Sequence, residues 1–120
     1  MNALLIIAHG SRRTQSNEEI RQLTATVAQH SLNKFDLVDC AFLELCEPYI
    51  PDGIANLAEK GAKHIKVLPY FLAKGTHVAD DVPAEVEKAI QSNPDLSVEI
   101  LPYLGTSGEL PALLLSIAGD

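Results

Sequence analysis

The chain has 120 residues, of which 47% are hydrophobic and 21% charged, and its formal net charge is −7. This length and balance are typical of one folded domain over residues 1–120 and argue against a disordered tail. The acidic charge argues against nucleic acid as a partner, because nucleic-acid-binding surfaces are basic. No apolar run reaches the ~20 residues of a membrane span, and the first residues lack the pattern of a signal peptide. We therefore expect a cytoplasmic protein with no membrane partner.

Segments of strand character alternate with segments of helical character along the chain. The predicted strands are aliphatic runs or runs in which apolar and polar residues alternate. The predicted helices begin at a capping-box pattern, as at Ser16, or at a proline in the first helical position. Strands are expected at 3–8, 36–43, 64–71 and 97–101. Helices are expected from 16, from 51 to 61, at 83–91 and from about 109. Helical crossovers between strands require a parallel sheet covered by helices. The sequence thus predicts an α/β fold, βαβαβαβα, with a four-stranded parallel sheet of order 2-1-3-4.

Chemically useful side chains follow three of the predicted strands. His9 comes directly after the first strand, Glu44 ends the second, and His77 lies in the loop after the third. Ligands of open α/β sheets bind beyond the carboxyl ends of the strands, where the strand order reverses. The loop at 71–81 is also longer than the ~2–6 residues usual in α/β units, and long loops tend to be functional. We therefore expect these three side chains to share one site.

Several familiar chemistries are excluded by the motifs around this site. The first strand is followed by neither a phosphate-binding P-loop nor a dinucleotide-binding glycine motif. Ser11 is not part of a nucleophile elbow. Cys40 and Cys46 fit neither a redox pair nor a zinc ribbon, and we expect them to be reduced and structural. What remains is imidazole and carboxylate, a set suited to a borderline divalent metal ion.

Three acidic residues near this site each allow two interpretations. Glu47, in the loop before Pro48, is either a binding residue or a solvated side chain. Asp80 and Asp81 could coordinate a cation, or one of them could cap the helix that follows. His30 and His64 are interpreted as structural, since one lies near a helix C-terminus and the other opens a strand.

Three segments resemble the small, single-domain class II chelatases, the sirohydrochlorin cobaltochelatase and ferrochelatase family. They are LLIIAHGSR near the N-terminus, AFLELCEPYIPDGI at 41–54 and VLPYFLAKGTHVADDVP at 67–83. Larger members of that superfamily contain two such flavodoxin-like halves that face each other. The resemblance therefore implies that a chelatase-like domain of this size forms a homodimer.

The resemblance also implies roles for individual residues. His9 corresponds to a metal ligand and proton acceptor, and His77 to a second metal ligand. Glu44 corresponds to a catalytic acidic residue, with Glu47 as the competing position. The segment that would contact the tetrapyrrole substrate comprises Leu72, Ala73, Lys74, Gly75 and Thr76.

The function implied is insertion of Co²⁺ or Fe²⁺ into sirohydrochlorin, in cobalamin or sirohaem biosynthesis, with loss of two pyrrole protons. The metal (Co²⁺, Fe²⁺ or Ni²⁺) would be a substrate, and no tightly bound cofactor is expected. Arg12, Arg13 and Lys74 would supply a basic rim for the carboxylates of an anionic tetrapyrrole. An alternative is a non-enzymatic metal carrier that uses the same histidines, and a third is a regulatory flavodoxin-like module with a degenerate site.

Overall fold

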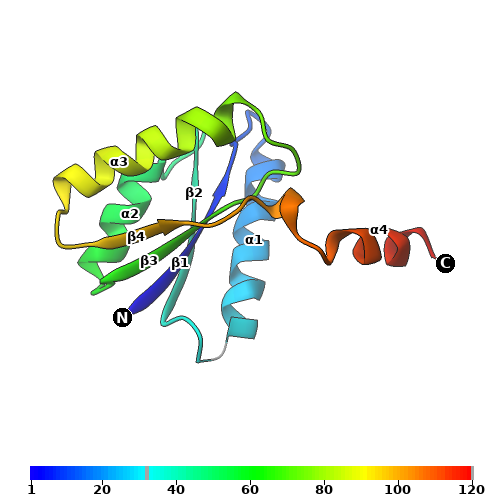
Figure 1. The fold of residues 1–120 in the computed structure, drawn as a ribbon, viewed down its shortest axis with the longest axis horizontal. Helices are drawn as coiled ribbons and strands as arrows, with labels where there is room; N and C mark the ends of the chain where they lie inside the picture. Colours follow the sequence, from blue (N-terminus) through cyan, green and yellow to red (C-terminus); the bar gives the residue numbers. More distant parts are fainter. Residues whose placement is uncertain (32, 120) are drawn as a thin grey trace.

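The computed structural model describes residues 1–31 and 33–119, and for His77 it describes the backbone alone. Four strands form one parallel sheet in the order β2-β1-β3-β4, which confirms the predicted topology. The strands, shown in Figure 1, are β1 (Asn2–Ala8), β2 (Leu37–Phe42), β3 (His64–Pro69) and β4 (Ser97–Ile100).

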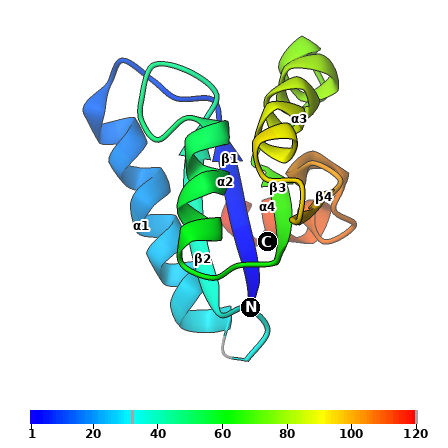
Figure 2. The same cartoon turned by 90° about the vertical axis from the view of Figure 1, so that its left-hand side faces the viewer.

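Helices lie on both faces of this sheet. They are α1 (Thr14–Ser31), α2 (Ile50–Glu59) and α3 (Val82–Ser92), with a π-helix η1 (His77–Asp81) before α3. A fourth helix, α4 (Leu110–Ala118), follows the 3₁₀ turn η2 (Leu104–Thr106) and extends away from the sheet (Figure 1). Figure 2 shows α1 on one side of the sheet and α2 with α3 on the other. Since β1 is central, it is buried on both faces, and this explains its uninterrupted aliphatic sequence.

The core has two layers, one on each side of the sheet. Alternate residues of β1, Leu5 and Ile7, point toward α2 and α3 and pack with Ile54, Leu57 and others. The intervening residues point toward α1, where they join Phe42. Both layers depend on the period-2 alternation of side chains along a strand.

Two local features differ from the sequence-based expectation. The first helix begins at Thr14 and not at the capping-box serine, because the turn between Ser11 and Asn17 already starts it. The long loop after β3 contains the π-helix η1, which no periodicity in the sequence indicated. Single-turn π-helices are rare and often occur at functional sites. The remaining elements match the expected ones to within two residues at each end described.

Candidate functional site

The site forms where the loops after β1 and β2 continue to run side by side. The parallel pairing of these strands extends past their ends, because Leu43 N–H donates to the Ala8 carbonyl (2.9 Å) and Glu44 N–H donates to the His9 carbonyl (3.0 Å). This places the two candidate side chains of the loops, His9 and Glu44, next to each other. His9 Nε2 lies 2.6 Å from Glu44 Oε2, with 47% and 52% of the two side chains exposed.

Gly10 allows this close approach of the two loops. Its φ is +94°, in the left-handed region, and a Cβ at this position would lie 1.8 Å from the Glu44 carbonyl oxygen. Only glycine fits without moving the backbone. The glycine that follows His9 therefore lets the loop that carries Glu44 approach the end of the first strand.

The backbone at Leu45 also departs from ordinary geometry. Leu45 has φ of +67°, and its side chain is 49% exposed. A non-glycine residue in the left-handed region is uncommon and costs free energy, and such positions cluster at functional sites. This strain follows Glu44 directly, so it belongs to the segment that positions the carboxylate.

A buried asparagine holds the loop after β1, and sequence reasoning missed it. Asn17 is 7% exposed; its side-chain oxygen accepts from Ser11 N–H (2.9 Å) and its amide donates to the Ser11 carbonyl (2.8 Å). Ser11 Oγ in turn accepts from Arg13 N–H at 3.0 Å, so the serine has a structural contact. A signal was present in the sequence, because Asn17, Ile20 and Thr24 recur at the helical spacing of the inward face of α1.

The two alternative carboxylates, Glu44 and Glu47, lie in different surroundings. Arg21 of α1 donates to the Glu47 carbonyl (3.4 Å) and to Cys46 Sγ (3.1 Å), and its guanidinium stacks 5.6 Å from the centroid of the Phe42 ring. These contacts hold the Glu47 backbone toward α1. Glu44 is the carboxylate that the structure brings to the imidazole of His9.

The third wall of the site comes from the segment after β3. A hollow of about 280 Å³ is lined by Glu44 and Leu43 on one side and by Asp81, Ala84 and Glu85 on the other. The end of η1 and the first turn of α3 therefore face Glu44 across this hollow. Asp81 occupies the N-cap position of α3, and no side-chain capping hydrogen bond is found there within the described part of the chain.

The predicted metal ligand His77 opens η1, and its side chain lies outside the described part of the structure. Among the described side chains, no group of three or more His, Cys, Asp or Glu residues is arranged to hold a metal ion. Of the two expected metal ligands, the structure thus describes the side chain of His9, which lies beside the expected catalytic residue Glu44.

The residues expected to contact a substrate lie exposed around this edge. Arg12 and Arg13 follow the β1 loop, and Lys74 lies in the loop after β3, as do Ala73, Gly75 and Thr76. Leu72 is 69% exposed, yet its backbone is tightly packed, since a Cβ on Gly105 would lie 1.8 Å from the Leu72 carbonyl oxygen. Gly105 N–H also donates to the Phe71 carbonyl at 3.0 Å, so η2 braces this segment.

The cysteines agree with the structural interpretation. Both are free thiols; Cys40 is buried in the sheet and Cys46 is partly exposed. Burial raises the pKa of the Cys40 thiol, while the hydrogen bond with Thr24 opposes this rise. Cys40 is therefore an inert core residue.

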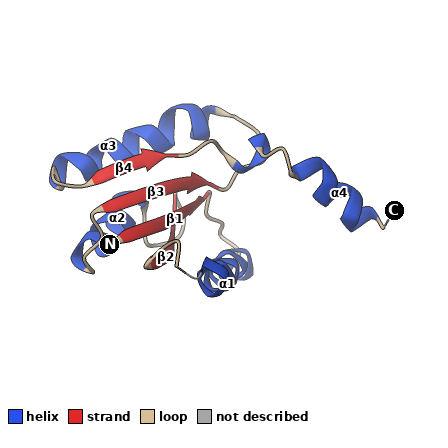
Figure 3. Ribbon diagram, turned by 60° about the horizontal axis from the view of Figure 1, so that its bottom comes forward, coloured by secondary structure: helices blue, strands red, loops and turns tan. Residues whose placement is uncertain are grey.

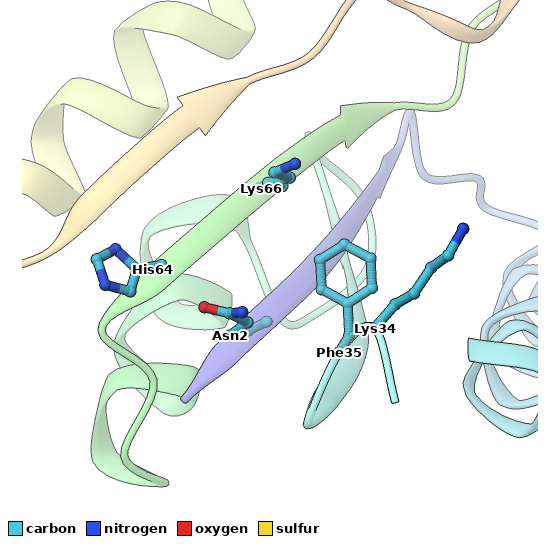
Figure 4. Close-up of a pocket in the computed structure, with 6 residues that line it drawn as sticks. Asn2, Lys34, Phe35, His64 and Lys66 are labelled. Atoms are coloured by element: carbon cyan, nitrogen blue, oxygen red, sulfur yellow. The ribbon is translucent and has the colours of Figure 1, made fainter. Parts of the chain in front are cut away.

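A second hollow, of about 430 Å³, lies at the opposite edge of the sheet (Figure 4). It is lined by residues at or near the amino ends of the strands, namely Asn2, Ala3, Lys34, Phe35, His64 and Lys66. Since Asn2 and His64 begin β1 and β3, this hollow is separated from the pair of His9 and Glu44 by the length of the strands. It does not belong to the same site.

The chain folds as a chelatase-like parallel α/β domain, with the pair of His9 and Glu44 at the carboxyl edge of its sheet. The CbiX family model matches residues 3–118, and the chain belongs to the CbiX family.

A sirohydrochlorin cobaltochelatase of Methanocaldococcus jannaschii is 40% identical over 83 residues, which cover 69% of this chain and 57% of the relative. The chain thus spans little more than half the length of that protein.

Solved structures show the same fold. The sirohydrochlorin chelatase SirB from Bacillus subtilis subspecies spizizenii, in complex with cobalt, matches with a TM-score of 0.88 and 27% identity, over 99% of this chain and 50% of that one. A putative CbiX protein from Marinobacter aquaeolei matches with a TM-score of 0.84 and 23% identity, over 98% and 94% of the two chains, and shows the fold alone. The chain therefore corresponds to one half of the larger chelatase.

Proposed function

We propose that this protein inserts a divalent metal ion, Co²⁺ or Fe²⁺, into sirohydrochlorin, and that residues 1–120 act as one chelatase-like domain. The observation that carries the proposal is the 2.6 Å pair of His9 Nε2 and Glu44 Oε2 at the carboxyl edge of the sheet. Relatives named as sirohydrochlorin cobaltochelatases and ferrochelatases support the choice of reaction. The product belongs to cobalamin or sirohaem biosynthesis according to the metal.

In this reaction one M²⁺ replaces two pyrrole protons, so the site must hold a cation and accept protons. The neutral imidazole of His9 is a suitable ligand for Co²⁺ or Fe²⁺. Glu44, within hydrogen-bond distance of the same ring, can orient His9 or receive a proton from it. His77 would be the second metal ligand. Co²⁺, Fe²⁺ or Ni²⁺ is a substrate here, and no resident cofactor is part of the proposal.

The surroundings suit an anionic macrocycle. Arg12, Arg13 and Lys74 are exposed cations in loops that follow β1 and β3, in a chain whose net charge is −7. Charged side chains of this kind pair with carboxylates, while the exposed face of Leu72 offers apolar contact to the ring system. Ala73, Gly75, Thr76 and Glu47 complete the proposed substrate surface.

A homodimer is part of the proposal. The single domain presents the site at one open edge of its sheet. A flat macrocycle needs a second wall to be enclosed, and a second copy of the domain would supply it. The match to one half of the larger SirB chain supports this arrangement. A cytoplasmic location also remains a prediction; none of the helices in the described residues is long and apolar enough to span a bilayer.

The test is anaerobic metal insertion by the purified protein, followed by the absorbance change of sirohydrochlorin, with Co²⁺, Fe²⁺ and Ni²⁺ compared. Glu44→Gln is the informative variant, because it keeps the shape and removes the charge. The matched control is Glu47→Gln, three residues away in the same loop. Loss of activity in the first variant alone supports Glu44 as the functional carboxylate. Metal binding with no tetrapyrrole binding would replace the enzyme by the metal carrier that shares its histidines.

A further inference from the structure

The loop that carries Glu44 leaves the sheet at the end of β2 and returns to the same place. Phe42 N–H donates to the Pro48 carbonyl at 2.8 Å and closes residues 43–48 into a loop, which we name the carboxylate loop. Only its first half is joined to the rest of the sheet, because Leu43 and Glu44 donate to the end of β1 and to the residue after it. The position of the Glu44 carboxylate therefore depends on what holds the second half.

The second half of the carboxylate loop has little backbone support. Within the described part of the chain, residues 45–47 form no backbone–backbone hydrogen bond. Leu45 nevertheless has φ of +67°, in the left-handed region that is unfavourable for a leucine. A conformation of this kind persists only where the surrounding structure enforces it. Contacts made by side chains must therefore keep Leu45 in place.

One side chain of α1 makes these contacts. Helix α1 lies next to β2, the edge strand of the sheet (Figure 3). From there Arg21 Nη2 donates to Cys46 Sγ (3.1 Å) and to the Glu47 carbonyl oxygen (3.4 Å). Among the described residues, Arg21 is the only one outside the carboxylate loop whose side chain hydrogen-bonds to residues 45–47. It therefore fixes the two residues that follow the strained Leu45.

The guanidinium of Arg21 is itself held from two further sides. Its Nη1 donates to Glu18 Oε2 at 3.3 Å, and its central carbon lies 5.6 Å from the centroid of the Phe42 ring, which is fully buried. An arginine can meet all of these groups at once because its donors are spread around a rigid plane. Since 41% of the Arg21 side chain is exposed, each contact contributes little free energy. The contacts fix the direction of the carboxylate loop more than they stabilise the fold.

We infer that Arg21 is a positioning residue for the metal insertion proposed above, because it holds the carboxylate loop in the conformation that puts Glu44 on His9. The inference rests on the proposed function and adds a residue to it. Within the described structure Arg21 has no hydrogen bond to His9 or Glu44. It acts through Leu45, the residue between Glu44 and the contacts made by the guanidinium. Without these contacts Leu45 relaxes to a negative φ, and the rotation of the backbone carries the Glu44 carboxylate away from the imidazole.

The first experiment compares anaerobic metal insertion into sirohydrochlorin by the parent protein, Arg21→Gln and Lys60→Gln, with the metal that the parent inserts fastest. Arg21→Gln should lower kcat at least about 10-fold, as loss of a residue that orients a functional group does, and leave the KM for sirohydrochlorin near that of the parent. Lys60→Gln is the matched control, since it removes the cation of another exposed ion pair, 3.8 Å from Asp39, and it should keep the parent kcat. If Arg21→Gln does not fold, Arg21→Lys, which lacks the planar fork, takes its place with the same expected result. A variant with the parent kcat, or with a change in KM alone, overturns the inference.

A second substitution tests the path through Leu45. Asparagine adopts the left-handed conformation more readily than leucine, so Leu45→Asn should make the carboxylate loop less dependent on Arg21. The loss of kcat caused by Arg21→Gln should therefore be at least about 5-fold smaller in the Leu45→Asn background, which is the factor that relief of one strained residue represents. Equal losses in the two backgrounds overturn the path through Leu45.

A measurement that does not use activity separates the inference from the proposed function. Nuclear Overhauser contacts between the His9 ring protons and the Glu44 side chain should be present in the parent and in Lys60→Gln, absent in Arg21→Gln, and restored in Arg21→Gln/Leu45→Asn. A parent that shows this pattern but inserts no metal overturns the proposed function and supports the hold of Arg21 on the carboxylate loop. An active parent whose Arg21→Gln variant keeps the contact overturns the inference and leaves the proposed function standing.

Discussion

Replacing Gly10 by alanine should separate the two halves of the site, because this residue touches the loop that carries the carboxylate. The added Cβ would lie 1.8 Å from the Glu44 carbonyl oxygen, where real contacts are at least 3.0 Å. The loops must then part by roughly 1 Å, which displaces Glu44 from His9. The φ of +94° cannot relieve the contact, since it is itself unfavourable for alanine.

The magnitude follows from three contributions. The left-handed conformation costs alanine about 1–2 kcal/mol. Losing the hydrogen bond from Glu44 N–H to the His9 carbonyl, 3.0 Å in the structure, costs about 0.5–1.5 kcal/mol. Alanine also reduces the entropy of the unfolded chain, which offsets about 0.4–1 kcal/mol. We expect Gly10→Ala to lower the free energy of unfolding by about 2 kcal/mol.

The assay is urea denaturation followed by circular dichroism, with the midpoint as the readout. A loss of this size should lower the midpoint by about 1 M, for m-values of ~1–3 kcal/mol/M. Gly108→Ala is the matched control, because a Cβ there meets no atom within 4 Å, and its midpoint should stay near that of the parent. If Gly10→Ala is as stable as Gly108→Ala, the close packing of the two loops described above is wrong.

The remaining predictions concern the site and the cysteines. His9→Ala should abolish most metal insertion and leave the urea midpoint unchanged, because the side chain is half exposed and its loss opens no core cavity; full activity would remove His9 from the mechanism. Arg12→Gln/Arg13→Gln should raise the KM for sirohydrochlorin and weaken its dependence on salt, and equal KM values across ionic strengths would place the substrate carboxylates elsewhere. Cys46 should react with a thiol reagent in the native protein, while Cys40, whose pKa is raised chiefly by burial, should react only on unfolding; rapid labelling of both would contradict the described core.

The parallel arrangement of the strands and the edge shared by the residues that follow them were predictable, because they depend on local patterns. The aliphatic run before His9 can be a strand buried on both faces, and helical crossovers make such strands parallel. Once the strands are parallel, the residues that follow them must share an edge. His9 and Glu44 could therefore be placed together from their positions after two strands.

The details of that site could not be predicted, since they depend on contacts between distant residues. Nothing in a single sequence states that Gly10 lies against the Glu44 carbonyl or that Asn17 binds the backbone of Ser11. Arg21 likewise looks like a surface residue of a helix until it meets Phe42 and the Glu47 carbonyl. These contacts, and not the motif, separate the environments of the two candidate carboxylates.

By itself, the sequence determined the elements, their parallel arrangement and the edge at which the chemistry collects, because hydrophobic periodicity and crossover length are local properties of the chain. The tertiary structure alone decided which carboxylate meets His9, how η1 and α3 close the hollow, and that α4 leaves the sheet with its apolar side exposed. An apolar helix pattern predicts burial but does not say against which surface. That choice depends on the turns around Gly105, whose geometry is set by packing against a loop more than thirty residues earlier in the chain.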